Sequence, residues 1–434
     1  MNDQAISKKD NMEKPLTQHI KNDGSWLTLK EYESVGGYQA LKKALKMTPK
    51  DVIKTVKDSG LKGRGGAGFS TGTKWSLIHS GEGVSAIKYI IANADEMEPG
   101  SFKDRLLLEG NPHQLIEGLI IGAYAIQAPM SYIFLRWAYH QAGKALTQSI
   151  QEAYDAGYLG KHIAGSDFSL DMSLHISVGR YMCGEETALL NALEGKRANP
   201  RAKPPYPSDS GLFGKPTIVN NTETLSNVPH IIINGADWFV KLSKTGEGGT
   251  KLYGASGKVK KPGLWELPLG TSLREIFEEH AGGMREGYKF KGVLPGGGST
   301  DFLIEEHLDV AMDYASVSKI GSRLGTGTII VLDDKTCAVG MVHNLERFFA
   351  QESCGWCTPC REGLPWTAKI LNALEEGKGK MEDLDILTFH THYMAPGTTF
   401  CALAPGAMEP LQSALKYFRE DFERHIHTHK CPWK

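Results

Sequence analysis

The sequence of 434 residues lacks the marks of a membrane-spanning or secreted protein. Its longest apolar stretch, GLIIGAYAI at 118–126, is far shorter than the ~18 residues that a membrane-spanning helix needs. The opening residues, MNDQAISKKDNMEK, contain no apolar segment of the kind found in a secretory signal. We therefore expect a protein that is soluble when made and is not itself inserted in a membrane.

An excess of charge of one sign is also lacking. The chain has 49 Lys and Arg against 50 Asp and Glu, which gives a formal net charge of −1. No basic stripe is visible, so nothing favours nucleic-acid binding. The apolar content of 41% and charged content of 23% are typical of a globular protein, and the length predicts more than one domain.

Cysteine is scarce, and its spacing argues against a disulfide scaffold. The seven cysteines are an odd number in a long chain, and three of them are clustered. The cluster is SCGWCTPCR, with Cys354, Cys357 and Cys360, and Cys401 follows after 40 intervening residues. C-x-x-C-x-x-C with one remote Cys is typical of a [4Fe–4S] cluster. Zinc is the alternative, although structural zinc sites more often use paired knuckles.

The other cysteines have plainer interpretations. We expect Cys183 to be a buried thiol and Cys337 to lie on a helical face that packs in the core. Cys431 ends the tail HIHTHKC, whose alternating histidines could suggest a metal site. A solvated terminus is the preferred interpretation of this tail.

After a polar tail at 1–30, the residues at 31–242 are predicted to form an α/β region. Helices are expected at 38–46 and 48–60, the second with Thr48 as its N-cap. Strands alternate with further helices, which favours a largely parallel sheet. The strands are expected at 88–93, 132–135 and 174–178, and the helices at 113–127 and 144–154.

Two further regions follow. Residues 243–330 are compatible with a small β-grasp domain, because two short strands, a helix at 271–283 and another strand follow one another. Ser272 and Glu275 would form a capping box at the start of this helix. After a strand at 328–332, the region 331–434 is predicted to be a helical bundle. Its helices are expected at 336–352, 362–376, 382–393 and 407–425.

A glycine-rich run, GRGGAGFSTG at 63–72, could approach a phosphate-bearing ligand closely. Gly63, Gly65 and Gly68 fit G-x-G-x-x-G, but a helix is predicted before them, so we reject the standard dinucleotide fingerprint. Arg64 and Lys74 would add positive charge. The alternative is a plain flexible turn.

Polar residues gather after two of the predicted strands, where ligands bind in open α/β sheets. Asn93, Asp95, Glu96 and Glu98 follow the first strand. Tyr181, Glu185 and Glu186 follow the last strand, and a proline-rich loop at 200–217 could form a lid. The alternative for the acidic residues is a solvated surface.

Together these motifs resemble the flavoprotein subunit family of NADH-quinone oxidoreductases, the respiratory complex I. The resemblance covers roughly residues 30–425 and is carried by motifs in the same order. The motifs are GRGGAGFSTGTKW, NADEMEPGSFKDR, YMCGEETALLNALEG, KPPYP, GLFGKPTIVNNTETL, ESCGWCTPCREG and TFCALAPGA.

The resemblance implies a Rossmann-like α/β domain that binds FMN, a ubiquitin-like β-grasp domain and a helical bundle that carries a [4Fe–4S] cluster. The substrate would be NADH, which would give hydride to FMN, and a carboxylate at Glu186 would favour NADH over NADPH. The implied cofactor-binding residues are Gly63, Arg64, Gly65, Gly66, Gly68, Phe69, Lys74, Asn93, Asp95, Glu96, Glu98, Tyr181, Glu185, Glu186, Lys203, Tyr206, Asn220 and Asn221. The implied cluster ligands are Cys354, Cys357, Cys360 and Cys401.

The resemblance also implies partners. These would be the [2Fe–2S] subunit and the larger iron–sulfur subunit of the peripheral arm of complex I, which would hold the chain at the cytoplasmic side of a bacterial inner membrane. The nearest alternative is the diaphorase subunit of an NAD-linked hydrogenase or formate dehydrogenase. A non-catalytic electron carrier and a zinc-bound interaction module are weaker alternatives.

Overall fold

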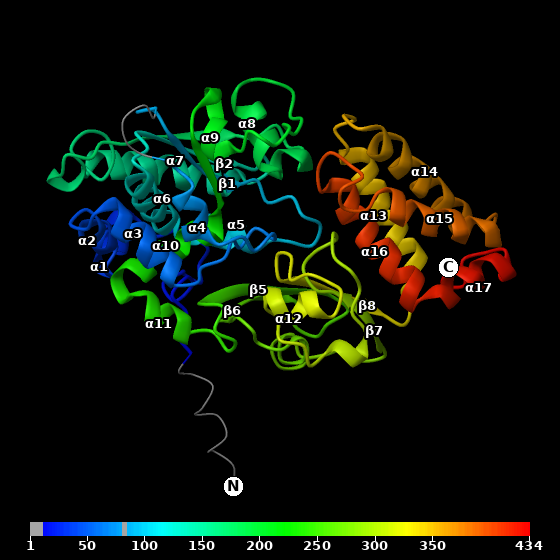
Figure 1. Ribbon diagram of the computed structural model, residues 1–434. Coiled ribbons are helices and arrows are strands. Elements are labelled where there is room, and N and C mark those ends of the chain that lie inside the picture. The colour runs from blue at the N-terminus through cyan, green and yellow to red at the C-terminus, as the bar shows by residue number, and fades with distance from the viewer. Residues whose placement is uncertain (1–11, 80–84) are drawn as a thin grey trace, which may run out of the picture.

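The computed structural model describes residues 12–79 and 85–434, which form three regions (Figure 1). The first region, coloured blue to green, surrounds a parallel sheet. A second sheet lies beneath it, and a group of helices, orange to red, lies to the right. An α/β layer, a small mixed sheet and a helical bundle thus follow one another in the predicted order. Within the described ranges, no helix has the length and apolar character required to cross a membrane.

The first sheet has four parallel strands in the order β3-β2-β1-β4. They are β1 (Tyr89–Ala94), β2 (Met130–Leu135), β3 (Asp171–Ile176) and β4 (Thr217–Asn221). The sequence predicts the first three. It does not predict β4, because this strand of five residues runs directly into a helix and its polar end resembles a helix start.

Helices cover this sheet on both faces, and their starts follow local sequence signals. The predicted N-cap Thr48 accepts a hydrogen bond from the Asp51 amide at 3.2 Å. Every residue of α6 except Tyr124 is buried, which explains its long apolar run. The helices are α1 (Leu29–Ser34), α2 (Gln39–Ala44), α3 (Pro49–Asp58), α4 (Thr71–Ser76), α5 (Lys103–Gly110), α6 (Pro112–Ile126), α7 (His140–Asp155), α8 (Glu186–Leu193), α9 (Pro207–Ser210), α10 (Thr222–Asn234) and α11 (Ala236–Lys241).

Close packing of α6 against α10 depends on one glycine. A Cβ atom at Gly118 would lie 2.0 Å from the carbonyl oxygen of Leu225. That separation is impossible between non-bonded atoms, so only glycine lets the two helices approach this closely.

The second sheet has the order β6-β5-β8-β7, with β5 and β8 parallel and the other pairs antiparallel. Its helix differs from the prediction in detail. Ser272 accepts from the Glu275 amide at 3.2 Å, but the Glu275 carboxylate binds Lys244 instead of closing a capping box. The elements are β5 (Thr250–Gly257), β6 (Gly263–Pro268), the π-helical turn η4 (Glu275–His280), β7 (Phe290–Leu294), α12 (Tyr314–Lys319) and β8 (Thr328–Asp333).

Five helices form the third region, where four are predicted. The helix expected at 407–425 is divided at Phe418, which has non-helical angles of φ −127° and ψ 28°. Its buried ring packs edge-on against Phe302 of the second region, and this tertiary contact ends one helix and starts the next. The helices are α13 (Ala338–Glu352), α14 (Thr358–Glu375), α15 (Met381–Tyr393), α16 (Leu403–Tyr417) and α17 (Arg419–Thr428).

The C-terminal tail is not solvated throughout, contrary to expectation. His425 is fully buried and Cys431 is 4% exposed, whereas His427 and His429 are exposed. Cys337 lies at the start of the predicted helix and is partly buried. It is the N-cap of α13, where its sulfur accepts a hydrogen bond from the Gly340 amide.

Candidate functional site

The first sheet opens a crevice at the carboxyl ends of β1 and β4. The chain continues from β1 to β2 and β3 on one side of the sheet and returns to β4 on the other. In parallel sheets, ligands bind at this point of divergence. Asn93 lies at the end of β1 and Asn221 at the end of β4, paired across the sheet, so the polar residues predicted to form a site do meet at one edge.

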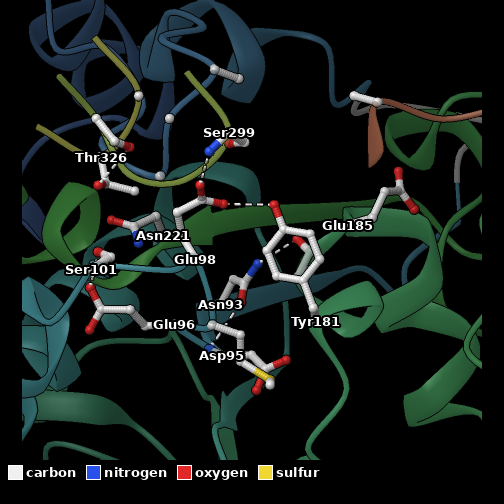
Figure 2. A pocket seen from close by; sticks show the side chains of 18 of the residues that line it. Asn93, Asp95, Glu96, Glu98, Ser101, Tyr181, Glu185, Asn221, Ser299 and Thr326 are labelled. Atoms are coloured by element: carbon white, nitrogen blue, oxygen red, sulfur yellow. Dashed lines mark hydrogen bonds between the residues drawn. The ribbon is translucent and has the colours of Figure 1, made fainter. Parts of the chain in front are cut away.

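A pocket at this edge is lined by residues of all three regions (Figure 2). The predicted residues that line it are Gly65, Gly66, Asn93, Asp95, Glu96, Glu98, Tyr181, Glu185 and Asn221. Loops of the second region add Ser299, Arg323, Gly325 and Thr326, and Cys401 contributes from the third. The other predicted residues lie around the pocket and not in its wall.

The glycine-rich loop presents backbone to this pocket. An isolated bridge between Lys62 and Ser70 closes the loop, and no strand directly precedes it. Gly66 and Gly68 have φ values of +124° and +67°, a left-handed conformation that L side chains rarely adopt. A Cβ on Gly65 would lie 3.1 Å from the Asn221 Cβ. The loop therefore brings bare main chain to a site where a side chain would take up the space.

The Arg64 side chain does not point into the pocket, as a phosphate contact would require. Its Nη2 donates to the carbonyl oxygens of Gly248 and Thr250 at 2.9 and 3.1 Å. Within the first region, Lys103 supplies positive charge to the pocket wall instead, and it is paired with Asp104 at 2.7 Å. The sequence analysis missed both residues, although they belong to the motif NADEMEPGSFKDR that carried the resemblance.

A buried charge network supports the floor of the pocket from behind. Lys103 also contacts Glu223 at 2.8 Å, and Glu223 contacts Lys251 of the second sheet at 3.2 Å. Burial alone would raise the pKa of Glu223, but the two lysines outweigh it and lower the pKa to about 2. Asn221 donates to Asp104 at 2.6 Å, so the network fixes the amide at the end of β4.

Glu98 joins three loops of the pocket wall. Its carboxylate accepts from the Tyr181 hydroxyl at 2.6 Å and from the Ser299 amide at 2.7 Å (Figure 2). Burial raises the pKa of Glu98. The loop after β1, the loop after β3 and a loop of the second region are thereby held in one arrangement.

Two other acidic residues of this loop have different roles. Glu96 is structural, because its carboxylate accepts from the Ser101 hydroxyl and from the amides at the start of α5. Asp95 is available to a ligand. Burial raises the pKa of Asp95 to about 7, with Ser177 and Arg136 opposing the rise. In the described part of the chain, neither oxygen of this carboxylate makes a direct hydrogen bond of normal length.

Beside the pocket, Glu186 lies between two lysines. Its carboxylate oxygens contact the ammonium groups of Lys74 and Lys203, each at 2.8 Å. Burial alone would raise the pKa of Glu186, but the lysines lower it to about 2. The rings of Phe69 and Tyr206 are 54% and 55% exposed, so both are free to stack on a planar ligand.

Three other predicted residues make hydrogen bonds within the protein that hold the elements around the pocket in place. Gly63 donates its amide to the Phe69 carbonyl, which closes the glycine-rich loop. Asn220 accepts from the Trp75 indole at 2.8 Å, so its side chain serves the core. Glu185 caps α8 through the amides of Thr187 and Ala188.

The four cysteines predicted to bind a cluster come from two segments that meet beside the pocket. Cys354, Cys357 and Cys360 lie between α13 and the first turn of α14, and Cys401 precedes α16. Burial, with smaller contributions from the thiols of Cys357, Cys401 and Cys354, raises the pKa of Cys360 to about 12. Burial likewise raises the pKa of Cys401 to about 11, with added contributions from Glu185, Cys354 and Cys357.

Comparisons with known proteins agree with this arrangement. Residues 56–230 match the Nuo51 FMN-binding domain, residues 255–302 the SLBB domain, and residues 340–425 the NADH-ubiquinone oxidoreductase-F iron-sulfur binding region. These matches and the site define an oxidoreductase subunit with an FMN-binding domain and a [4Fe–4S] region.

Whole-chain relatives narrow the class further. The chain is 57% identical over 418 residues to the F subunit of the NADH-quinone oxidoreductase of Buchnera aphidicola subsp. Acyrthosiphon pisum, covering 96% of this chain and 94% of the relative. It is 56% identical over 413 residues to the F subunit of the Escherichia coli enzyme, covering 95% and 93%. The chain belongs to this family, the flavoprotein (F) subunits of NADH-quinone oxidoreductases.

A solved structure of an NAD+-reducing [NiFe]-hydrogenase in the H2-reduced state has a similar fold. Its TM-score is 0.81 at 33% identity, and the match covers 94% of this chain and 68% of that chain. The identity to the NADH-quinone oxidoreductase relatives is much higher, which favours them over the hydrogenase-type alternative.

Proposed function

We propose that this chain oxidises NADH as the electron-input subunit of an NADH-quinone oxidoreductase. The observation that carries the proposal is the pocket in which the end of the first sheet, the loops of the second region and Cys401 meet. When bound, FMN would supply the conversion of a two-electron hydride donor into the single electrons that an iron–sulfur cluster can take up. The residues of this chain supply binding, orientation and the electrostatic environment.

The pocket fits a flavin nucleotide. The bare backbone at Gly65 and Gly66 can approach a phosphate or ribityl chain without steric conflict. The amides of Asn93 and Asn221 and the carboxylate of Asp95 can bind hydroxyl groups. We assign the flavin site to Gly63, Arg64, Gly65, Gly66, Gly68, Lys74, Asn93, Asp95, Glu96, Tyr181, Glu185, Asn220 and Asn221, with Arg64, Glu96 and Asn220 positioning and not touching the ligand.

NADH would enter on the open side of the pocket. The exposed rings of Phe69 and Tyr206 can stack on its bases, and Glu186 can accept from ribose hydroxyls. Lys203 holds the outer face of Glu186. Glu98 orients Tyr181 at the inner wall.

We assign the iron–sulfur cluster, which would accept these electrons, to the four predicted cysteines. Four thiolates at Cys354, Cys357, Cys360 and Cys401 supply one ligand for each iron of a cubane. Because Cys401 is part of the pocket wall, the site assigned to the cluster adjoins the site assigned to the flavin. We assign the regions 31–242, 243–330 and 331–434 to flavin and NADH binding, β-grasp and cluster binding, with 1–30 as a tail.

Membership of this family implies association with other peripheral-arm subunits. We propose that these include the [2Fe–2S] subunit and the larger iron–sulfur subunit, at the cytoplasmic face of a bacterial inner membrane. Next to the cluster cysteines, Trp356 and Phe400 are 57% and 42% exposed and pack against each other. An exposed aromatic pair beside an electron carrier suits a protein interface.

An anaerobic optical titration with NADH tests the function. The purified chain, co-expressed with a [2Fe–2S] partner, should lose its flavin band with about one NADH per flavin. The Cys401→Ser variant serves as a matched control, because its flavin should still bleach while the share of the iron–sulfur absorption that belongs to the [4Fe–4S] cluster is lost. A folded, cluster-loaded sample whose flavin NADH does not reduce would refute the proposal and leave an electron carrier.

A further inference from the structure

A second group of metal-type ligands lies at the end of the α13–α14 helix pair that is remote from the cluster cysteines. It consists of Cys337, Glu375, His425 and Cys431, whose ligand atoms all lie within 4.8 Å of one another. Cys337 is the N-cap of α13 and Glu375 ends α14, whereas the cluster loop joins the other ends of these helices. The 15 residues of α13 therefore separate the two sites by about 22 Å.

The geometry of this group is close to that of a tetrahedral site. The Cys337 sulfur lies 3.0 Å from Glu375 Oε1 and 3.3 Å from His425 Nε2, and these two atoms are 3.2 Å apart. Ligand bonds of about 2.0–2.3 Å to zinc place neighbouring ligand atoms at roughly 3.4–3.8 Å. For these three atoms, shifts of a few tenths of an ångström would reach tetrahedral spacing, and the Cys431 sulfur, which lies within 4.8 Å of them, would complete the set by side-chain rotation.

His425 is oriented as a metal ligand is. Its Nδ1 lies 2.6 Å from the carbonyl oxygen of Asp421, so Nδ1 carries the proton and donates it. In the neutral ring this leaves the Nε2 lone pair directed at Cys337 and Glu375. A backbone carbonyl that fixes the tautomer in this way is the usual outer partner of a ligating histidine.

The site is enclosed and its charges balance. His425 is fully buried, the Glu375 side chain is 7% exposed, and the Trp433 ring stacks on His425. Lys434 contacts Glu375 Oε2 at 2.5 Å, which leaves Oε1 to face the other ligands. Two thiolates and one carboxylate carry −3, and Lys434 carries +1. A divalent cation brings the sum to zero, which removes the cost of buried uncompensated charge.

The chain is also built to hold the tail in this position. A Cβ at Gly377, which follows α14, would lie 2.0 Å from the His429 carbonyl oxygen, and Gly377 has φ +72°. Only glycine permits both the left-handed turn and the close passage of the tail. The approach of Cys431 to Cys337 is thus specified by the packing between α14 and the tail.

We propose that Cys337, Glu375, His425 and Cys431 bind one Zn²⁺ ion, which fastens the C-terminal tail to the helical region. Two sulfurs, one imidazole nitrogen and one carboxylate oxygen form a donor set that suits zinc and not magnesium or calcium. A site with four protein ligands is closed and therefore structural. This site does not depend on the function proposed above, because it shares no residue with the pocket or with the cluster cysteines.

Elemental analysis and zinc-edge X-ray absorption of the full chain with its iron–sulfur cluster test this proposal. Protein produced in zinc-supplemented medium should hold about one zinc, with about two sulfurs near 2.3 Å and two lighter atoms near 2.0–2.1 Å. His425→Gln and Cys431→Ser should each lower bound zinc at least about tenfold. His427→Gln is the matched control, since His427 is exposed on the same helix and should keep its zinc.

Three results would overturn the proposal. One is protein with an intact cluster and reduced thiols that holds no zinc. Another is zinc coordinated by sulfur alone, or retained in both variants, which would place it at the cluster cysteines. The third is a disulfide between Cys337 and Cys431, found by mass spectrometry in protein prepared without air. If a variant fails to fold, the zinc-edge X-ray absorption of the unmutated protein still shows whether zinc is bound and by which atoms.

Discussion

Replacing Glu186 should change the choice between NADH and NADPH. The Glu186 carboxylate sits between Lys74 and Lys203, and the three groups together carry one positive charge. Glu186→Gln removes the negative charge and leaves two ammonium groups beside the proposed path of the nucleotide. A 2′-phosphate, which NADPH has and NADH lacks, should then bind more favourably.

The magnitude follows from Coulomb's law. One unit charge and a doubly charged phosphate about 8 Å apart interact by about 1 kcal/mol in a water-like dielectric. Because Glu186 is partly exposed, we use this screened value and not that of a dry interior. The ratio of kcat/KM for NADPH to that for NADH should therefore rise about fivefold.

Steady-state kinetics with a soluble electron acceptor at low ionic strength would measure the ratio for both nucleotides. Glu186→Asp preserves the charge and should keep the ratio near its original value, whereas Lys203→Gln should lower it. An unchanged ratio in Glu186→Gln, in protein with full flavin and cluster content, would show that Glu186 does not face the 2′ position.

Three further outcomes are expected. Gly118→Ala should lower the free energy of unfolding, measured in urea, by about 1–3 kcal/mol, because its Cβ would collide with Leu225. Gly143→Ala should not lower it, because the nearest neighbour of its Cβ would lie at 3.6 Å. Equal effects of the two substitutions would refute the packing argument. Cys401→Ser should lower the iron content while FMN stays bound, and full iron content would remove Cys401 from the ligand set. Burial raises the pKa of Glu346 well above its ordinary value of 4.5. Above pH 4.5 the unfolded chain releases this proton while the folded chain keeps it, so the free energy of unfolding falls as the pH rises toward the folded pKa. Glu346→Leu should therefore gain more stability at about pH 8 than at about pH 5, and an equal gain at both would contradict this account.

Much of the fold could be predicted because local signals agree with the tertiary structure. The N-cap at Thr48 and the apolar run of α6 each specify an element without long-range information. Where a tertiary contact decides, prediction fails. Phe418 divides a helix because its ring packs on Phe302 from another region, and no local pattern reveals that contact.

The candidate site shows the same division. Residues at strand ends, such as Asn93 and Asp95, could be predicted because the edge of a parallel sheet collects them. Ser299 and Arg323 could not, because they reach the pocket only when the second region docks on the first. The direction of the Arg64 side chain was unforeseeable for the same reason, since its partners are carbonyl oxygens of Gly248 and Thr250.

The contacts of Glu98 have a consequence for biogenesis. Its two hydrogen bonds reach residues 83 and 201 positions further along the chain, and Cys401 is added to the same wall still later in synthesis. The complete pocket therefore exists only after the last region has been made and has docked. Cofactor insertion must then be a late step, and a nucleotide that binds only the docked form stabilises it by mass action. In a cell short of flavin, the chain should therefore be degraded faster than the loaded protein.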